Sequence, residues 1–211
     1  MGGPSVRYPA MTRIIEILRE EHRNIEKLLL VLEQELGVFN RRERPDYEVL
    51  QAVIDYFKEY PASCHHPKED MIFEILKARD PAAADTVGDL EGEHQEEADR
   101  LRRLAWTIEN VRTGRDMLRE TVAAIVRDFI DHERRHIEME ERALFPAASK
   151  ALQSADWAQI DAHLSNQHDP LFNGAGEQRF HALRQQILQW ERENEDDRIK
   201  SLADARAGQS L

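Results

Sequence analysis

The sequence that decides the fold is FIDHERRHIEMEERALFP, residues 129–146. In an α-helix, side chains four residues apart lie on the same face, about one turn from each other, so His136 and Glu140 can reach one point in space. Apolar residues follow the same stretch at helical spacing. This imidazole and this carboxylate therefore lie on or beside the buried face, where an unpaired charge is costly. A bound metal ion would remove that cost.

A second stretch repeats this pattern. It reads CHHPKEDMIF, residues 64–73, and it also places a histidine four residues before a glutamate. His65 corresponds to His136, and Glu69 corresponds to Glu140. A single H-x-x-x-E pattern is a weak signal, because helices rich in glutamate and histidine produce it by chance. Its duplication is the stronger observation.

Each copy is preceded by a Glu-His pair, at residues 21–22 and 93–94. The histidine of the first pair precedes His65 by 43 residues, and the histidine of the second precedes His136 by 42. The chain therefore divides into two halves, each with the pattern H…H-x-x-x-E. Histidines without a shared role have no reason to follow a two-fold pattern. The spacing predicts one site built from both halves.

The composition favours helices and argues against several classes of partner. Of the 211 residues, 33% are charged and 7% are aromatic, and Leu, Ala, Glu, Arg and Gln are abundant, which predicts an all-α protein. The net charge of −12 argues against a nucleic acid or an anionic membrane as partner. Cys64 is the only cysteine, so no intrachain disulfide can form. Without a signal peptide or an apolar run of ~18 residues, we expect a soluble cytoplasmic protein.

Apolar periodicity predicts four long helices. They are expected over about residues 11–36, 46–77, 80–112 and 115–145. Pro146 is expected to end the fourth helix. Prolines at positions 61 and 67 each remove a backbone donor, so we expect a kink or a brief break between Tyr60 and Pro67.

Helix lengths indicate that the four histidines meet. At ~1.5 Å per residue, His65 and His94 both lie about 20 Å from the turn near residue 79. His94 and His136 lie at similar distances from Gly114. In an antiparallel up-down four-helix bundle these positions fall at one level, to within about one turn.

The chain changes character after Pro146. We predict that residues 1–150 form the four-helix bundle with its metal site, and that residues 151–211 form a helical extension with a polar tail. In the extension, Ser154 is expected to cap a short helix, and a second helix is expected over about residues 177–192. The predicted fold class is thus all-α, with additional C-terminal helices packed on the bundle.

The two halves together offer six candidate metal ligands: His22, His65, Glu69, His94, His136 and Glu140. Six is too many for one tetrahedral zinc ion, and magnesium and calcium prefer oxygen ligands to imidazole. Two ions fit better. If each ion takes two histidines, both carboxylates bridge and an oxo or hydroxo group adds a further bridge, each ion keeps one open position. Iron is favoured, with manganese or a mixed metal pair as alternatives.

This set of motifs resembles the bacterial hemerythrin-like (HHE cation-binding) family. The resemblance covers about residues 11–146, and the Glu-His pairs, HHPKE at 65–69 and HIEMEERALFP at 136–146 carry it. It implies that the same six residues bind two irons in a four-helix bundle. It also implies a small ligand, namely dioxygen, peroxide or nitric oxide. The implied role is sensing, iron handling or oxidative and nitrosative stress response, with binding favoured over reduction of peroxide or nitric oxide. The oligomeric state is not predicted.

The sequence departs from the oxygen-carrying hemerythrins, which have five histidines and two carboxylates. The duplicated pattern supplies four histidines, which argues against a plain oxygen carrier. His132, one turn before His136, is a candidate for the fifth ligand or for a partner of a ligand, and is otherwise a solvated histidine. His66 points about 100° away from His65 in a regular helix, so it is interpreted as a neighbour unless Pro67 exchanges their roles.

Four acidic residues lie next to candidate ligands in the sequence. They are Glu21, Asp70, Glu93 and Glu141. Such residues are more often surface charges, but some of them could hold ligand imidazoles.

Two other classes of protein compete with this interpretation. A ferritin-like di-iron oxidase or iron store uses Glu-x-x-His pairs, which occur here as Glu91 with His94 and Glu133 with His136. The histidines at positions 22 and 65 argue against that class. The other alternative is a metal-free helical interaction module, in which the pattern would be a coincidence.

Overall fold

The computed structural model describes residues 10–164, 169, 171, 180–189 and 192. Every regular element in this part of the chain is helical, which confirms the predicted all-α class. In order, the elements are α1 (Ala10–Asn40), α2 (Tyr47–Tyr60), η1 (Pro61–His65), α3 (His66–Arg79), α4 (Pro81–Val87), α5 (Leu90–Arg112), α6 (Arg119–Met139), η2 (Glu140–Leu144), α7 (Phe145–Ala151) and α8 (Ser154–Leu164).

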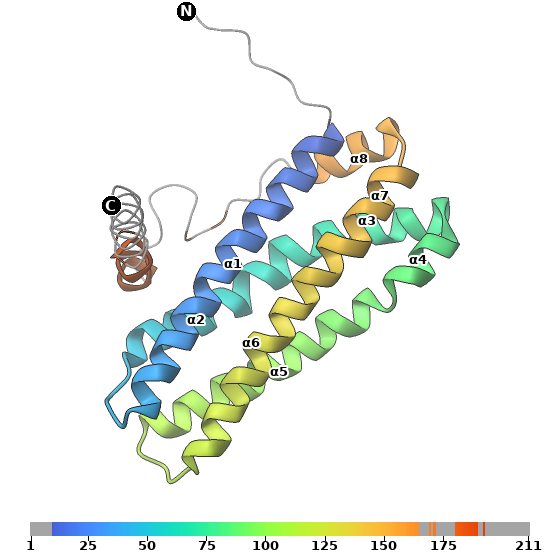
Figure 1. Ribbon diagram of the computed structural model, residues 1–211. Coiled ribbons are helices and arrows are strands. Elements are labelled where there is room, and N and C mark those ends of the chain that lie inside the picture. The colour runs from blue at the N-terminus through green and yellow to red at the C-terminus, as the bar shows by residue number, and fades with distance from the viewer. Residues whose placement is uncertain (1–9, 165–168, 170, 172–179, 190–191, 193–211) are drawn as a thin grey trace, which may run out of the picture.

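The long helices pack side by side into a bundle (Figure 1). Helix α6 packs against α1 and α5, and α2 packs against α5 and α1. The continuous helical rod α2–η1–α3 and the rod α6–η2–α7 each run the length of the bundle (Figure 1). Helix α8 packs against α1 and α3 at one end. Within the described residues, no helix is both long and apolar enough to cross a membrane.

The apolar core consists of two clusters with a polar layer between them. On α1, Leu18 belongs to one cluster and Ile25 to the other. On the rod α6–η2–α7, Ile130 belongs to one and Leu144 to the other. Between these apolar positions, buried histidines and glutamates occupy the intervening turns of α1 and of the rod α6–η2–α7. The two apolar clusters thus enclose the polar layer from both ends of the bundle.

The prolines beside the predicted ligands widen the helix without breaking it. The turns η1 and η2 are π-helical. In each, the residue before the proline closes the wide turn: the N–H of His66 donates to Pro61, and the N–H of Phe145 donates to Glu140. Such a turn accommodates a residue that has no N–H and whose ring crowds the preceding turn. The expected perturbation between Tyr60 and Pro67 is therefore present, as a π-helical turn in a continuous helix and not as a break. The expected helix end at Pro146 is wrong, because the helix continues to Ala151.

The predicted third helix is two helices. Helix α4 ends at Gly88, whose φ of 98° lies in the left-handed region that favours glycine. The Asp89 side chain then caps α5 by accepting from the N–H of Gly92. The sequence contains both the stop and the new start, but the apolar periodicity continues through them. Helix α1 also runs beyond Gly37, to Asn40.

The C-terminal part is described only in places. The short helix predicted from Ser154 is confirmed as α8, and Trp157 belongs to the same core cluster as Leu18. Residues 181–189 are helical, and Leu183 is buried in the other cluster. Most of the rest of the predicted extension, residues 165–168, 170, 172–179, 190–191 and 193–211, lies outside the described residues. The division at residue 150 stays a prediction.

Candidate metal centre

All six predicted ligands lie together in the polar layer. The carboxylates of Glu69 and Glu140 are fully buried, with no exposed surface. His22, His65 and His136 are at most 3% exposed. The side chain of His94 retains 11% exposure. A buried carboxylate without a compensating charge is costly, so these residues form either an ion-pair network or a metal site.

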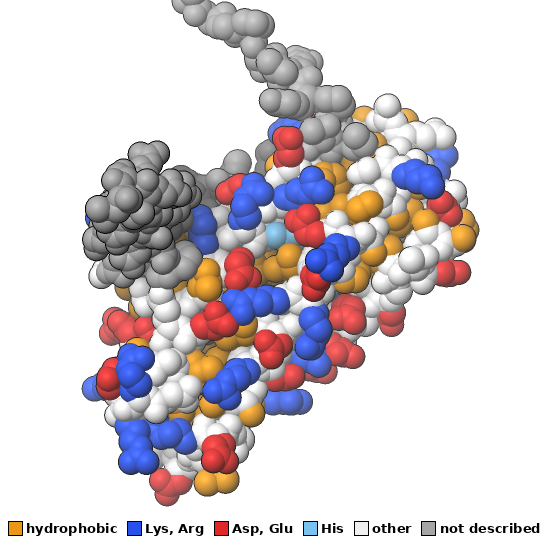
Figure 2. Space-filling model, viewed as in Figure 1, with side chains coloured by type: hydrophobic (Ala, Val, Ile, Leu, Met, Phe, Trp, Pro, Cys, Tyr) orange, Lys and Arg blue, Asp and Glu red, His pale blue; other side chains and the backbone are white. Residues whose placement is uncertain are grey.

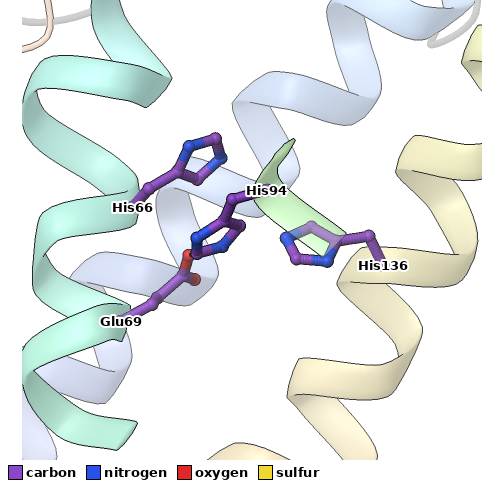
Figure 3. A group of neighbouring side chains, drawn as sticks. All are labelled: His66, Glu69, His94 and His136. Carbon is purple, nitrogen blue, oxygen red and sulfur yellow. The ribbon is translucent and has the colours of Figure 1, made fainter. Parts of the chain in front are cut away.

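One group of potential ligands consists of His66, Glu69, His94 and His136, and we call it the first group. Its ligand atoms all lie within 4.8 Å of one another. Figure 3 shows the four side chains pointing toward one another from α3, α5 and α6. The rings of His66 and His94 are stacked, with centroids 4.0 Å apart.

The second group consists of His22, His65, Glu69 and Glu140, with ligand atoms again within 4.8 Å of one another. Nε2 of His22 lies 3.3 Å from Oε1 of Glu69 and 3.2 Å from Oε2 of Glu140. Nε2 of His65 lies 3.2 Å from Oε1 of Glu69. All four side chains are buried.

Two carboxylates connect the groups. Glu69 belongs to both. Glu140 belongs to the second group, but its Oε1 lies 3.3 Å from Nε2 of His136 and 3.9 Å from Nε2 of His94. Both carboxylates therefore lie between the two sets of imidazoles, as bridging ligands require.

The hydrogen bonding of the centre fits a metal better than it fits a closed polar network. Among the described residues, Oε2 of Glu69, Nε2 of His94, both ring nitrogens of His136 and both oxygens of Glu140 are buried and have no hydrogen-bond partner. Buried polar atoms are nearly always satisfied. Imidazole nitrogens and carboxylate oxygens are also the donor atoms that iron, manganese and zinc accept.

Three carboxylates hold the outer nitrogens of the imidazoles. Nδ1 of His22 lies 3.1 Å from Glu141, Nδ1 of His65 lies 2.9 Å from Glu21, and Nδ1 of His94 lies 3.1 Å from Asp70. A carboxylate only accepts, so Nδ1 carries the hydrogen and Nε2 remains free to face the centre. The prediction that some acidic neighbours hold imidazoles is confirmed for these three.

Glu21 is the most enclosed of these partners. It is 6% exposed and also accepts from the Tyr60 hydroxyl at 2.7 Å and from the ammonium group of Lys68, which is 3% exposed. Burial raises the pKa of Glu21, but the hydrogen bonds and charges of His65 and Lys68 lower it by more. The pKa is therefore below its ordinary value, and the carboxylate is charged. The sequence analysis missed Tyr60 and Lys68, because neither belongs to the duplicated pattern.

The electrostatics of the metal-free centre couple imidazolium ions to carboxylates. Burial disfavours the charged form of His22, but Glu140 and Glu69 raise its pKa to about 11. Burial likewise opposes the charge on His94, but Asp70, Glu140 and Glu69 raise its pKa to about 12. Burial raises the pKa of Glu69, and His65, His22 and His94 hold it well below its ordinary value. Without a metal, protons therefore supply the positive charge that the carboxylates need.

His66 is a candidate ligand that sequence analysis assigned as a neighbour. The wide turn η1 holds one more residue than an α-helical turn, which brings successive side chains closer in direction. His65 and His66 can therefore both face the interior. Oε2 of Glu97 lies 2.9 Å from Nε2 of His66, so this imidazole also has a carboxylate partner. The signal in the sequence was Pro67, which indicated a local departure from regular helix.

His132 is neither solvated nor a member of either group. It is 3% exposed, and its ring is nearly parallel to that of His136, with centroids 6.3 Å apart. Burial lowers its pKa, and the nearby charge of Arg100 adds to this effect. The expectation of a solvated histidine is wrong, because the residue lies on the buried face of α6 one turn before His136.

The glutamates of the ferritin-like alternative lie outside both groups. Glu91 is exposed. Glu133 is buried, and burial together with the charges of Glu97 and Glu140 raises its pKa well above the ordinary value. Because neither glutamate belongs to a ligand group, the Glu-x-x-His alternative gains no support.

The fold and the site define a helical bundle with a buried histidine–carboxylate centre for cations. Comparison with known families agrees: the model described as the hemerythrin HHE cation binding domain matches residues 13–148. This match covers more than half of the chain, so the chain belongs to the hemerythrin HHE cation-binding family. Comparisons with curated proteins and with solved structures return no match.

Proposed function

We propose that this protein is a non-haem di-iron protein that binds a small ligand at an open iron position. The observation that carries the proposal is the pair of four-residue ligand groups that share Glu69 in the interior of the bundle. Its architecture is proposed to be an antiparallel up-down four-helix bundle of α1, α2–η1–α3, α5 and α6–η2–α7. Iron is favoured for the mixture of imidazole and carboxylate ligands, with manganese or a mixed pair as alternatives.

The ligand groups give the two ions different surroundings. His66, His94 and His136 would hold the first ion, and His22 and His65 the second, with the two bridging glutamates shared. The second ion thus has one imidazole fewer, and an open position is expected there. Iron at that position supplies a coordination site for dioxygen, peroxide or nitric oxide. The second group is buried and Phe145 stacks on the His22 ring with centroids 5.4 Å apart, so these surroundings suit a small, uncharged ligand.

The proposed physiological role is sensing, iron handling or oxidative and nitrosative stress response, with the small ligand as the partner of the protein. Binding is favoured over enzymatic reduction. The net charge of −12 argues against a nucleic acid or an anionic membrane as partner. A cytoplasmic location is part of the proposal and is consistent with the single cysteine.

Titration of the ferrous protein under anaerobic conditions tests this function. We expect that dioxygen, nitric oxide or peroxide changes the near-ultraviolet and visible absorption, and that the change saturates at about one ligand per pair of irons. A reversible change would indicate binding or sensing, and consumption of the ligand would indicate turnover. An iron-loaded protein whose spectrum does not respond to any of the three would contradict the proposal.

The identity of the fifth histidine can be tested with two matched variants. We expect His66→Ala to lower the iron content from about two to about one per chain, because the first ion loses an imidazole while the second group is intact. His132→Ala removes a buried histidine on α6 that lies in neither group, so its iron content should stay near two. Metal analysis of both variants checks this. Loss of iron in His132→Ala alone would show that the wrong histidine had been assigned.

A further inference from the structure

A surface groove leads to one side of the metal centre. Its volume is about 410 Å³, and it lies between α5 and the rod α2–η1–α3. His66 and His94 of the first group line its inner end. His94 has the largest exposed fraction of the predicted ligands. Behind it, the fully buried Oε2 of Glu69 has no hydrogen-bond partner and lies 3.7 Å from Nε2 of His94. A continuous series of ligand atoms therefore runs from the groove to the second group.

The groove is lined by charged side chains of both signs. Asp70 and Glu91 are exposed at its lining, and Glu97 is buried in it. Two cations also line it, Lys58 and Arg102, but Arg102 is paired with Asp99 outside the groove. Carboxylate oxygens are ligands for divalent cations. Asp70 and Glu91 can therefore bind a metal ion on its way to His94.

The opposite side of the centre is covered by ion pairs. The guanidinium of Arg19 lies 3.0 Å from Glu141, the carboxylate that holds His22. Glu21 holds the other imidazole of the second group, that of His65, and the buried Lys68 pairs with Glu21. Figure 2 shows the face formed by α1 and α6, where basic and acidic side chains are interspersed and little histidine surface is visible. The imidazoles of the second group, His22 and His65, are at most 3% exposed, so they offer little surface to a metal cation that approaches from this side.

We infer that this groove is the port through which metal ions enter and leave, and that the two ions exchange in sequence. The first position exchanges directly with solvent, and the second exchanges only through the first. An ion that enters at the first position moves on to the second, and a later ion then occupies the first. On release, the first position empties before the second. This inference rests on the two-ion centre proposed above.

Release and loading kinetics of ferrous iron test the port. Protein loaded anaerobically with two ferrous ions is mixed with excess ferrous chelator, and the absorbance of the chelate is followed. We expect two phases of about one iron each. Ala98→Trp fills the groove one turn beyond His94 and should slow both phases at least tenfold. Ala124→Trp, on exposed surface of α6, is the control and should leave both rates unchanged.

A charge reversal tests the same port without added bulk. Glu91 and Glu120 are both exposed and both are the second residue of their helices, α5 and α6. We expect Glu91→Lys to slow ferrous loading of the metal-free protein about three- to tenfold at low ionic strength, with a smaller effect in high salt. Glu120→Lys should load like the unchanged protein. Protein that binds fewer than two irons would overturn the proposed function. Two irons with single-phase release, or with equal rates in groove and control variants, would overturn the port alone.

Discussion

Glu69→Gln is expected to abolish binding of both metal ions. Glu69 is the one residue that both ligand groups share, and its two oxygens face imidazoles of both groups. Glutamine keeps the shape of the side chain but removes the negative charge and replaces one acceptor oxygen by an N–H₂ donor. We expect the iron content to fall from about two to below about 0.2 per chain, as measured by metal analysis.

The same variant should destabilise the metal-free protein. Glu69 is fully buried and is held in its charged form by His65, His22 and His94. Removal of one member of a buried charge network leaves the others uncompensated, at a cost of about 3–5 kcal/mol. For a chain of this size, the unfolding temperature should fall by on the order of 10 °C.

Glu133→Gln is the matched control for Glu69→Gln. Glu133 is also a buried glutamate beside the centre, but it belongs to neither ligand group. Burial and the charges of Glu97 and Glu140 raise its pKa well above the ordinary value, which favours the neutral form that glutamine resembles. Iron content and unfolding temperature should stay close to those of the unchanged protein. Equal loss of iron in both variants would mean that general disruption of the polar layer, rather than lost coordination, explains the effect.

Removal of metal from the loaded protein is expected to lower its stability strongly. A ligand present at 1,000 times its dissociation constant stabilises the folded state by about 4 kcal/mol per site. Two sites therefore contribute about 8 kcal/mol, and the unfolding temperature should fall by about 15 °C or more when a chelator removes the ions. Thermal unfolding followed by circular dichroism, with and without chelator, measures this. An unfolding temperature that does not change on chelation would contradict a metal centre in the core.

The pH dependence of this stabilisation has a definite sign. In the metal-free protein, the pKa of His22 is about 11 and that of His94 is about 12, above the ordinary 6.5. The ion pairs of these two imidazolium groups with Glu69 and Glu140 therefore contribute stability. This contribution is complete below pH 6.5 and is lost as the pH rises through about 11–12. A metal ion must displace those protons, so its own contribution grows with pH. The difference in unfolding temperature between loaded and metal-free protein should thus widen from pH 6 to pH 9.

Much of the centre could be predicted because ligand spacing in a helix is a local property. The duplicated H-x-x-x-E pattern and its equal spacing from the two Glu-His pairs identified six residues that the structure brings together. Helix lengths predicted that they would lie at one level. The family match over residues 13–148 confirms the resemblance that these motifs carry.

The rest could not be predicted because it depends on departures from regular helix and on tertiary burial. A proline indicates that a helix is perturbed, but the choice between a break and a wide π-helical turn depends on packing around Pro67 and Pro146. The wide π-helical turn η1 directs the side chain of His66 toward the interior. A lysine is normally expected on the surface. The burial of Lys68 is explained only by its ion pair with Glu21 on α1. Gly88 interrupts a helix whose apolar pattern continues on both sides.

The most direct test of the central claim is the iron content of the purified protein. We predict about two irons per chain by metal analysis, accompanied by near-ultraviolet charge-transfer absorption that disappears together with the metal. Purified protein that contains no metal after growth with iron, takes up none when ferrous iron is added anaerobically, and unfolds at the same temperature with and without it would contradict the account.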